Sequence, residues 1–108
     1  MNDKILTLLG FAAKAGKLSY GFDAVKTSLS QNKSKLVLIA NNVSAKSQKE
    51  VLFFCNRFKT QALVLDAYDM ETISHAVGKR CGIVSVNDIS FANGLLSAIN
   101  VGRNLNDK

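Results

Sequence analysis

A chain of 108 residues, of which 47% are hydrophobic, 20% are charged and none is Pro, is long enough to bury its own core, so we expect a single domain over residues 1–108. No apolar run approaches the roughly 18 residues that a membrane span needs, and the amphipathic start, KILTLLGFAAKAG, is too short for a signal peptide and has Lys near both ends. The two Cys lie far apart, no CxxC pair is present and there is a single His, which argues against a disulfide framework and a zinc site. We therefore expect a cytoplasmic protein without a metal ion or cofactor.

Hydrophobic periodicity predicts helices and strands in alternation. In chain order we expect a helix over residues 3–14, a strand over 18–20, a helix led by Gly21, a strand over 35–40, a helix capped by Ser44, a strand over 62–65, a helix from the cap Asp69 to Gly78, a strand over 83–86 and a helix that starts at Asp88 or Ser90. Such alternation predicts an α/β fold in three layers, with a sheet of mainly parallel neighbours between helices.

The whole excess of positive over negative charge lies in one third of the chain. Residues 14–49 hold seven Lys and one acid, whereas residues 1–13 and 50–108 are each neutral. A concentrated positive field attracts phosphate backbones, which makes nucleic acid the expected partner. A Lys-rich surface that only keeps the protein soluble is the alternative that charge alone leaves open.

The first candidate binding site is the junction at Gly21. A helix start exposes unpaired N–H groups and the positive end of the helix dipole, which suits an RNA phosphate. Gly21 would let a partner approach the backbone, Lys17 and Lys26 flank it, and Asp23 could accept a hydrogen bond from a base. The alternative is a plain turn in which Asp23 only complements the dipole.

The second candidate is the loop GKRCGI, residues 78–83, between a helix and a strand. Its adjacent Lys79 and Arg80 suit contacts with a phosphate backbone, Gly82 suits close approach, and Ile83 could lie against an exposed base. Loops at the strand ends of an open α/β sheet are where ligands usually bind. An ordinary connecting loop would have the same composition.

Enzymatic readings have little support in this sequence. The acids are scattered, His75 falls on a polar helix face, and Cys55 follows the apolar helical spacing of a core residue. Cys81 lies beside Lys79 and Arg80, which could lower the pKa of its thiol and make it reactive. No GxxxxGK[ST] or GxGxxG motif is present, so we expect no enzyme and no nucleotide-binding loop.

The segment GKLSYGFDAVKTSLSQNKSKLVLIANNVS resembles the central block of the ribosomal-protein family that binds kink-turn RNA, which includes an archaeal large-subunit protein and its snoRNP relatives. Together with LLGFAAKAGKLSYG, HAVGK and FANGLLSAI, it is similar to the group of that family called YlxQ. The resemblance implies a three-layer α/β/α sandwich with a four-stranded mixed sheet. It also implies a non-enzymatic partner of structured RNA, ribosomal or another non-coding RNA. We expect the protein to be a monomer.

The resemblance assigns family positions to residues of this chain. Gly21 matches the family Gly that begins the RNA-reading helix. In the family pattern this Gly is followed by a small residue, Asn and Glu, and further on by a Lys. The corresponding residues here are Phe22, Asp23, Ala24 and Thr27, and the Lys of this segment stands at position 26. The family loop over the unpaired bases corresponds to Arg80, Cys81, Gly82 and Ile83. The missing Asn–Glu pair leaves open a second reading, a protein-interaction module whose basic face binds an acidic partner.

Overall fold

The computed structural model describes residues 3–106, with side chains as far as Val101. Within this range the helices are α1 (Lys4–Lys14), α2 (Phe22–Ser30), α3 (Ala45–Arg57), α4 (Met70–Val77) and α5 (Ile89–Asn106). The strands are β1 (Leu18–Tyr20), β2 (Leu36–Ala40), β3 (Ala62–Leu65) and β4 (Ile83–Val86). All the elements expected from the sequence are present. Among the residues described, no helix combines the length and apolarity that crossing a membrane would require.

The four strands form one mixed sheet in the order β1-β4-β2-β3. Only β2 and β3, which α3 connects, run parallel, while β4 is antiparallel to both β1 and β2. The expectation of mainly parallel neighbours is therefore wrong, because β4 inserts between the two strands that α2 connects. The mixed sheet that the family resemblance implies is confirmed.

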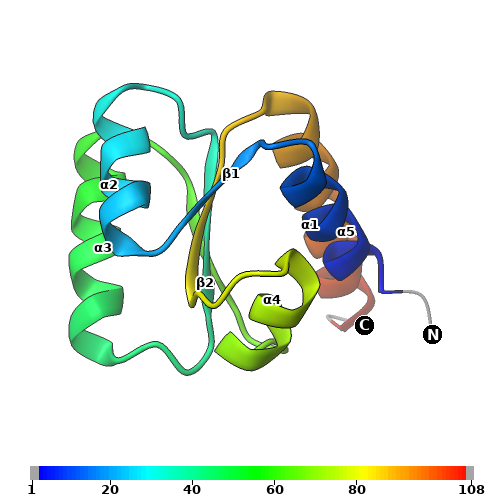
Figure 1. The fold of residues 1–108 in the computed structure, drawn as a ribbon. Helices are drawn as coiled ribbons and strands as arrows, with labels where there is room; N and C mark the ends of the chain where they lie inside the picture. The colour runs from blue at the N-terminus through cyan, green and yellow to red at the C-terminus, as the bar shows by residue number, and fades with distance from the viewer. Residues whose placement is uncertain (1–2, 107–108) are drawn as a thin grey trace.

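Helices cover both faces of the sheet, with α2 and α3 on one side and α1, α4 and α5 on the other (Figure 1). The sheet divides the core in two, and successive side chains of β2 point alternately into the two halves. Val37 and Ile39 pack under α2 and α3, whereas Leu36, Leu38 and Ala40 pack under the other helices, and all five are buried. A strand covered on both faces has no polar side, which explains the uninterrupted apolar run in the sequence. The α/β/α sandwich is confirmed.

Short-range signals set the helix ends. The side chains of Asp3, Ser44 and Asp69 accept hydrogen bonds from backbone N–H groups three residues on, as N-caps do. Gly78 adopts the left-handed conformation, with φ 77° and ψ 18°, directly after α4. The start of α2 differs from the others, because the residue before it is Gly21 and no side chain caps it.

Candidate nucleic-acid interface

The pairing of β1 with β4 joins the two segments that the sequence singles out. Tyr20 lies opposite Val84 in this antiparallel register, so the next residue, Gly21, reaches the start of β4. The N–H of Gly21 donates to the carbonyl of Ile83 at 2.9 Å. The start of α2 and the loop after α4 are therefore neighbours, although about 60 residues separate them in the chain.

The backbone at Gly21 has a conformation that favours Gly. Its φ of 86° and ψ of 164° fall in a region that residues with a Cβ rarely adopt, and a Cβ built there would have no atom within 4 Å. The junction is thus strained for other residues but open to solvent. With no side-chain cap, the N–H groups of the first turn of α2 are available to an anion, and the helix dipole adds positive potential there.

Two lysines of the candidate site lie over aromatic rings. The Lys79 Nζ atom is 5.2 Å from the centroid of the Tyr20 ring, and the Lys26 Nζ atom is 4.6 Å from that of Phe54. Such contacts hold a flexible ammonium near one position at little cost in solvation, because both lysines remain exposed. The ammonium groups of Lys79 and Lys26 thus rest over the Tyr20 and Phe54 rings and remain open to solvent.

Hydrogen bonds to Ser74 and to β2 hold the backbone of the loop after α4 in place. The Ser74 hydroxyl donates to the Cys81 carbonyl at 3.0 Å and accepts from the Cys81 N–H at 2.9 Å. The N–H of Ala40 donates to the carbonyl of Gly82 at 2.8 Å. Lys79 and Arg80 are exposed residues of this loop, so it presents two cations on a fixed base.

The structure corrects the roles expected for Ile83 and Gly82. Ile83 is only 5% exposed and packs in the core under α2 and α3, so its side chain cannot lie against a base. Gly82 is buried as well, and a Cβ there would come within 2.9 Å of both Met70 and Val43. The small size of Gly82 serves internal packing. A hollow beside the loop lies open, and its lining includes Met70, Asn42, Glu71 and both loop cations.

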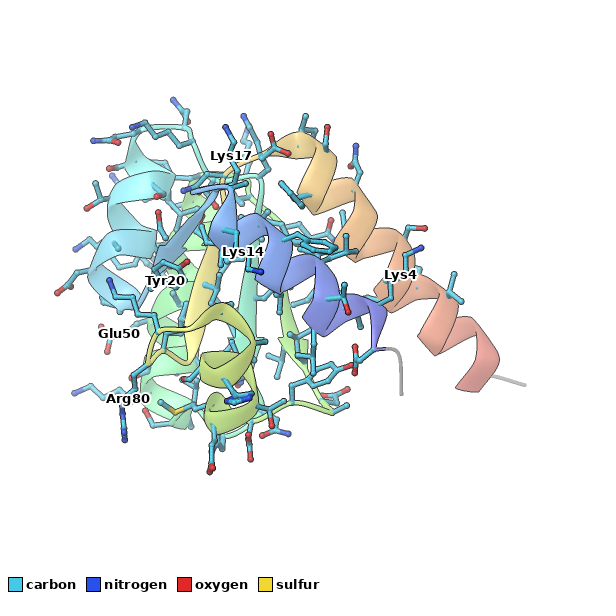
Figure 2. All side chains as sticks on the ribbon, turned by 45° about the vertical axis from the view of Figure 1, so that its right-hand side comes forward. Lys4, Lys14, Lys17, Tyr20, Glu50 and Arg80 are labelled. Atoms are coloured by element: carbon cyan, nitrogen blue, oxygen red, sulfur yellow. The ribbon has the colours of Figure 1, made fainter. Side chains whose placement is uncertain are left out.

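The other residues expected at the site are spread along α2 and β1. Asp23 is exposed in the first turn of α2. The Thr27 hydroxyl donates to the Asp23 carbonyl at 3.0 Å, and Phe22 is half-buried against Phe54, with ring centroids 6.1 Å apart. Lys17 precedes β1 and lies at the opposite end of that strand from Gly21, about 13 Å away by strand rise (Figure 2). Lys17 therefore belongs to a different part of the surface.

The thiols do not have the environment of a reactive cysteine. Burial raises the pKa of the Cys81 thiol, and this effect outweighs the opposing influence of the Lys79 ammonium and the Ser74 hydrogen bond. Burial also raises the pKa of Cys55 to about 11. The suggestion that neighbouring cations activate Cys81 is therefore wrong, because the side chain points into the core under the loop.

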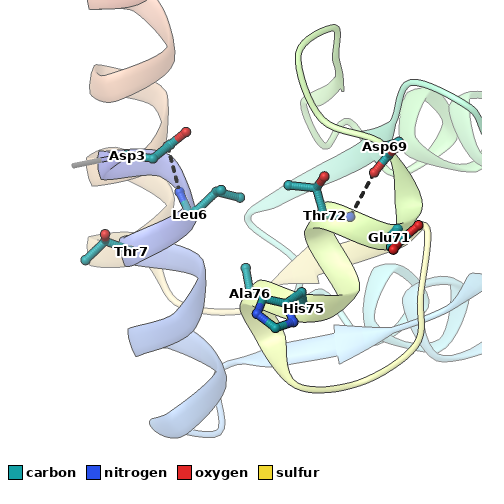
Figure 3. A pocket seen from close by; sticks show the side chains of 8 residues that line it. All are labelled: Asp3, Leu6, Thr7, Asp69, Glu71, Thr72, His75 and Ala76. Atoms are coloured by element: carbon teal, nitrogen blue, oxygen red, sulfur yellow. Dashed lines mark hydrogen bonds between the residues drawn. The ribbon is translucent and has the colours of Figure 1, made fainter. Parts of the chain in front are cut away.

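A groove between α1 and α4, which shares Glu71 and His75 with the hollow beside the loop, is lined by acids and by His75 (Figure 3). Two of its carboxylates are already used as helix caps, since Asp3 accepts from the N–H of Leu6 and Asp69 from that of Thr72. The resulting hydrogen bonds hold the pKa of Asp69 below its usual value. Among the residues described, no cluster of three or more His, Cys, Asp or Glu could hold a metal ion. An acid-lined groove is a poor match for a polyanion.

Sequence reasoning missed the aromatic and polar residues that order the site. Tyr20 and Phe54 read as core residues of a strand and a helix, and only the structure shows a lysine over each ring. Ser74 lies between the buried Ile73 and Val77 of α4, a position from which a polar side chain can reach the following loop. That break in an apolar stripe is the signal that could have identified Ser74.

The chain is similar to named proteins and to a solved structure over most of its length. The RNA-binding protein YlxQ of Bacillus subtilis is 31% identical over 93 residues, which cover 85% of this chain and 91% of that protein. The large ribosomal subunit protein eL30 of Candida glabrata is 35% identical over 82 residues, covering 74% of this chain and 77% of that protein. A solved structure of a Bacillus halodurans protein of unknown function superposes with a TM-score of 0.86 at 25% identity, over 92% of this chain and 99% of that one.

The family model described as the ribosomal protein L7Ae/L30e/S12e/Gadd45 family matches residues 3–95, nearly the whole of the helices and strands described above. This match confirms the family resemblance that the sequence suggested. The chain belongs to the ribosomal protein L7Ae/L30e/S12e/Gadd45 family.

Proposed function

We propose that this protein is a cytoplasmic, non-enzymatic RNA-binding protein that acts as a monomer and recognises a sharp bend in structured RNA, of the kink-turn kind, in ribosomal or another non-coding RNA. The observation that carries the proposal is the junction of Gly21 with the loop after α4, tied by the 2.9 Å hydrogen bond to Ile83. An uncapped helix start and a fixed cationic loop lie side by side, and the named relative YlxQ is an RNA-binding protein.

Each part of this surface has a role in the proposed complex. The N–H groups at the start of α2 bind a backbone phosphate, and Gly21 allows that phosphate to approach closely. Lys26, Lys79 and Arg80 contact phosphates on either side of the bend, while the Asp23 carboxylate accepts a hydrogen bond from a base edge. An unpaired base that the bend splays out enters the hollow beside Met70, in place of the contact expected from Ile83.

The changes at two family positions bear on selectivity. Ala24 offers no polar group, and the Thr27 hydroxyl is directed at the Asp23 carbonyl within its own helix. Each base contact that is lost costs about 1–3 kcal/mol of discrimination between sequences. We therefore expect this protein to depend more on RNA shape and phosphate contacts than on base edges.

The test is a titration of the protein, at physiological salt, against a kink-turn RNA and against the same duplex without its bulge. We expect clearly tighter binding of the bent RNA. Equal affinity for the two would overturn bend recognition. Weak, equal binding accompanied by tight binding to an acidic peptide would favour the protein-interaction reading of the same basic face.

A Lys26→Ala variant locates the site. We expect weaker binding of the bent RNA and a slope of log affinity against log salt that is shallower by about one, the change for one lost phosphate contact. Lys4→Ala is the matched control, since Lys4 is also exposed but lies on α1, well apart from Tyr20 and Arg80 (Figure 2). If the two variants behave alike, the binding surface is elsewhere.

A further inference from the structure

The outer face of α3 carries a second surface that the proposed contact with bent RNA does not use. Phe53 is 61% exposed, which is unusual for a large apolar side chain. Lys49 and Arg57 stand four residues before and after it, so all three lie on one ridge of the helix. One acid, Glu50, shares this helix with them. An exposed ring flanked by cations is the pattern of a platform for nucleic-acid bases.

This ridge borders a groove between α2 and α3. Lys26, Arg57, Phe54 and Asp23 are among the residues that line the groove. Cations thus come from both helices, and an aromatic ring lies between them. One end of the groove is lined by Asp23, in the first turn of α2, which is also part of the proposed site.

A chain of aromatic contacts leads from that site to Phe53. Phe22, next to Gly21, lies edge-on to Phe54, and Phe53 lies edge-on to Phe54 with ring centroids 5.4 Å apart. The face of Phe54 is already occupied by the Lys26 ammonium at 4.6 Å. Phe53 is therefore the ring whose face remains accessible to a stacking partner.

We propose that the groove between α2 and α3, together with the adjoining ridge of Phe53, binds an unpaired stretch of RNA that extends from the bent duplex, with a base stacked on Phe53 and a phosphate beside Arg57. Charge complementarity selects this occupant over an apolar peptide, since residues 22–59, which hold both helices, carry seven basic and two acidic side chains. The inference rests on the proposed function for the position of the duplex, and on Phe53 for the single strand.

The absence of Trp from the sequence makes a direct probe possible. In a Phe53→Trp variant the indole is the only one in the protein, so stacking of a base on it quenches its fluorescence. The ligands are the bent RNA with blunt ends, the same RNA with a six-nucleotide unpaired extension on either strand, and that hexanucleotide alone. Phe11→Trp is the matched control, because Phe11 is 56% exposed but lies on α1 in the other helix layer.

We expect an extended RNA, but not the blunt one, to quench the Phe53→Trp variant strongly and to leave the fluorescence of Phe11→Trp unchanged. In the wild-type protein an extension on the correct strand tightens binding by about tenfold, the effect of one stacked base, and Phe53→Ala abolishes that gain without changing affinity for the blunt RNA. Phe11→Ala keeps the gain. Since the Phe53 side chain is mostly exposed, its truncation leaves the fold intact, which melting curves verify.

The outcomes separate the two proposals. Bent RNA that binds tightly, with no gain from either extension, overturns the single-strand groove and leaves the proposed function standing. Bent RNA that fails to bind, while the hexanucleotide quenches Phe53→Trp and binds Phe53→Ala more weakly than wild type, overturns the proposed function and supports the groove. If the hexanucleotide and the extended RNAs all leave the indole of Phe53→Trp unquenched, the groove does not bind RNA.

Discussion

The N–H of Gly21 donates to the carbonyl of Ile83 across the junction of β1 with β4, at 2.9 Å. This bond fixes where α2 begins relative to the loop that carries Lys79 and Arg80. It also depends on the unusual backbone angles of Gly21, since φ 86° with ψ 164° turns the chain from the strand into the helix. One residue thus couples the geometry of the two segments.

The first prediction concerns Gly21→Ala. The new methyl group would enter open space at the helix start, where a bound phosphate would lie, so we expect a marked loss of affinity for bent RNA. We also expect the free energy of unfolding to fall by about 1–3 kcal/mol, because Ala is strained in this conformation. Fluorescence titration with bent RNA measures the loss of affinity, and chemical denaturation measures the fall in the free energy of unfolding.

A Gly16→Ala variant distinguishes the effect of backbone strain from the effect of a blocked contact with RNA. Gly16 also has a positive φ, 72°, and a Cβ there would likewise have no atom within 4 Å, but it lies between α1 and β1. We expect Gly16→Ala to lose stability while keeping RNA affinity. Equal losses of affinity in both variants would show that strain, and not access to the backbone, weakens binding.

The helix and strand content of this fold could be predicted because its signals are local. Asp69 caps α4 by bonding a backbone group three residues on, and Gly78 ends the same helix by adopting the left-handed conformation. The order of the strands could not be predicted. Alternating elements favour parallel neighbours, and nothing in the sequence of β4 shows that it inserts between β1 and β2.

The same distinction applies to the site. Gly21 and its neighbouring lysines could be proposed as site residues from residue type and charge, since a helix start next to Gly and Lys has a recognisable chemistry. The misassignment of Ile83 followed from its place at a loop end, where exposure depends on the layer above it. The layer that covers Ile83 is formed by α2 and α3, and it is a tertiary feature. The contacts of Lys79 with Tyr20 and of Lys26 with Phe54 are tertiary features as well.

The second prediction is that the thiols are slow to react in the folded protein. Burial raises the pKa of both Cys81 and Cys55, so little thiolate forms near pH 8 and reagents reach it poorly. We expect alkylation by iodoacetamide, followed by mass spectrometry, to be much slower than for a short Cys peptide and to reach the peptide rate in denaturant. Rapid labelling of Cys81 in the native protein would restore the thiol-enzyme reading.

The third prediction is that Gly82→Ala destabilises the protein. A Cβ at Gly82 would lie 2.8 Å from the Met70 Cγ atom and 2.9 Å from the Val43 Cγ2 atom. Val has little rotamer freedom, so the strand and loop must shift, at a cost of about 1–3 kcal/mol in the free energy of unfolding. Denaturant titration measures this cost.

The matched control for Gly82→Ala lies in α5. At Gly94 an added Cβ would meet only Leu8, at an ordinary 3.5 Å, and Gly94 is within a helix. We expect Gly94→Ala to stabilise the protein by about 0.4–1 kcal/mol. If Gly82→Ala instead keeps full stability and weakens RNA binding, Gly82 is a contact residue and not a packing residue.

The last prediction concerns high pH. The Tyr68 hydroxyl donates to the Asp3 carboxylate, and burial, followed by this hydrogen bond and the Asp3 charge, raises the pKa of Tyr68 to about 12 from an ordinary 10. A pKa raised in the folded state contributes stability that is complete below about pH 10 and is lost as the pH rises through 12. Above that range a phenolate would face the Asp3 carboxylate at the start of α1.

A Tyr68→Phe variant isolates this contribution, because lysines also lose their charge at high pH. We expect wild type to be more stable than Tyr68→Phe near neutral pH, by about 0.5–1.5 kcal/mol for one hydrogen bond. The difference should shrink between pH 10 and pH 12, as measured by urea denaturation at each pH. A difference that stays constant over that range would mean that Tyr68 does not titrate with a raised pKa, and that its hydrogen bond to Asp3 does not stabilise the neutral phenol.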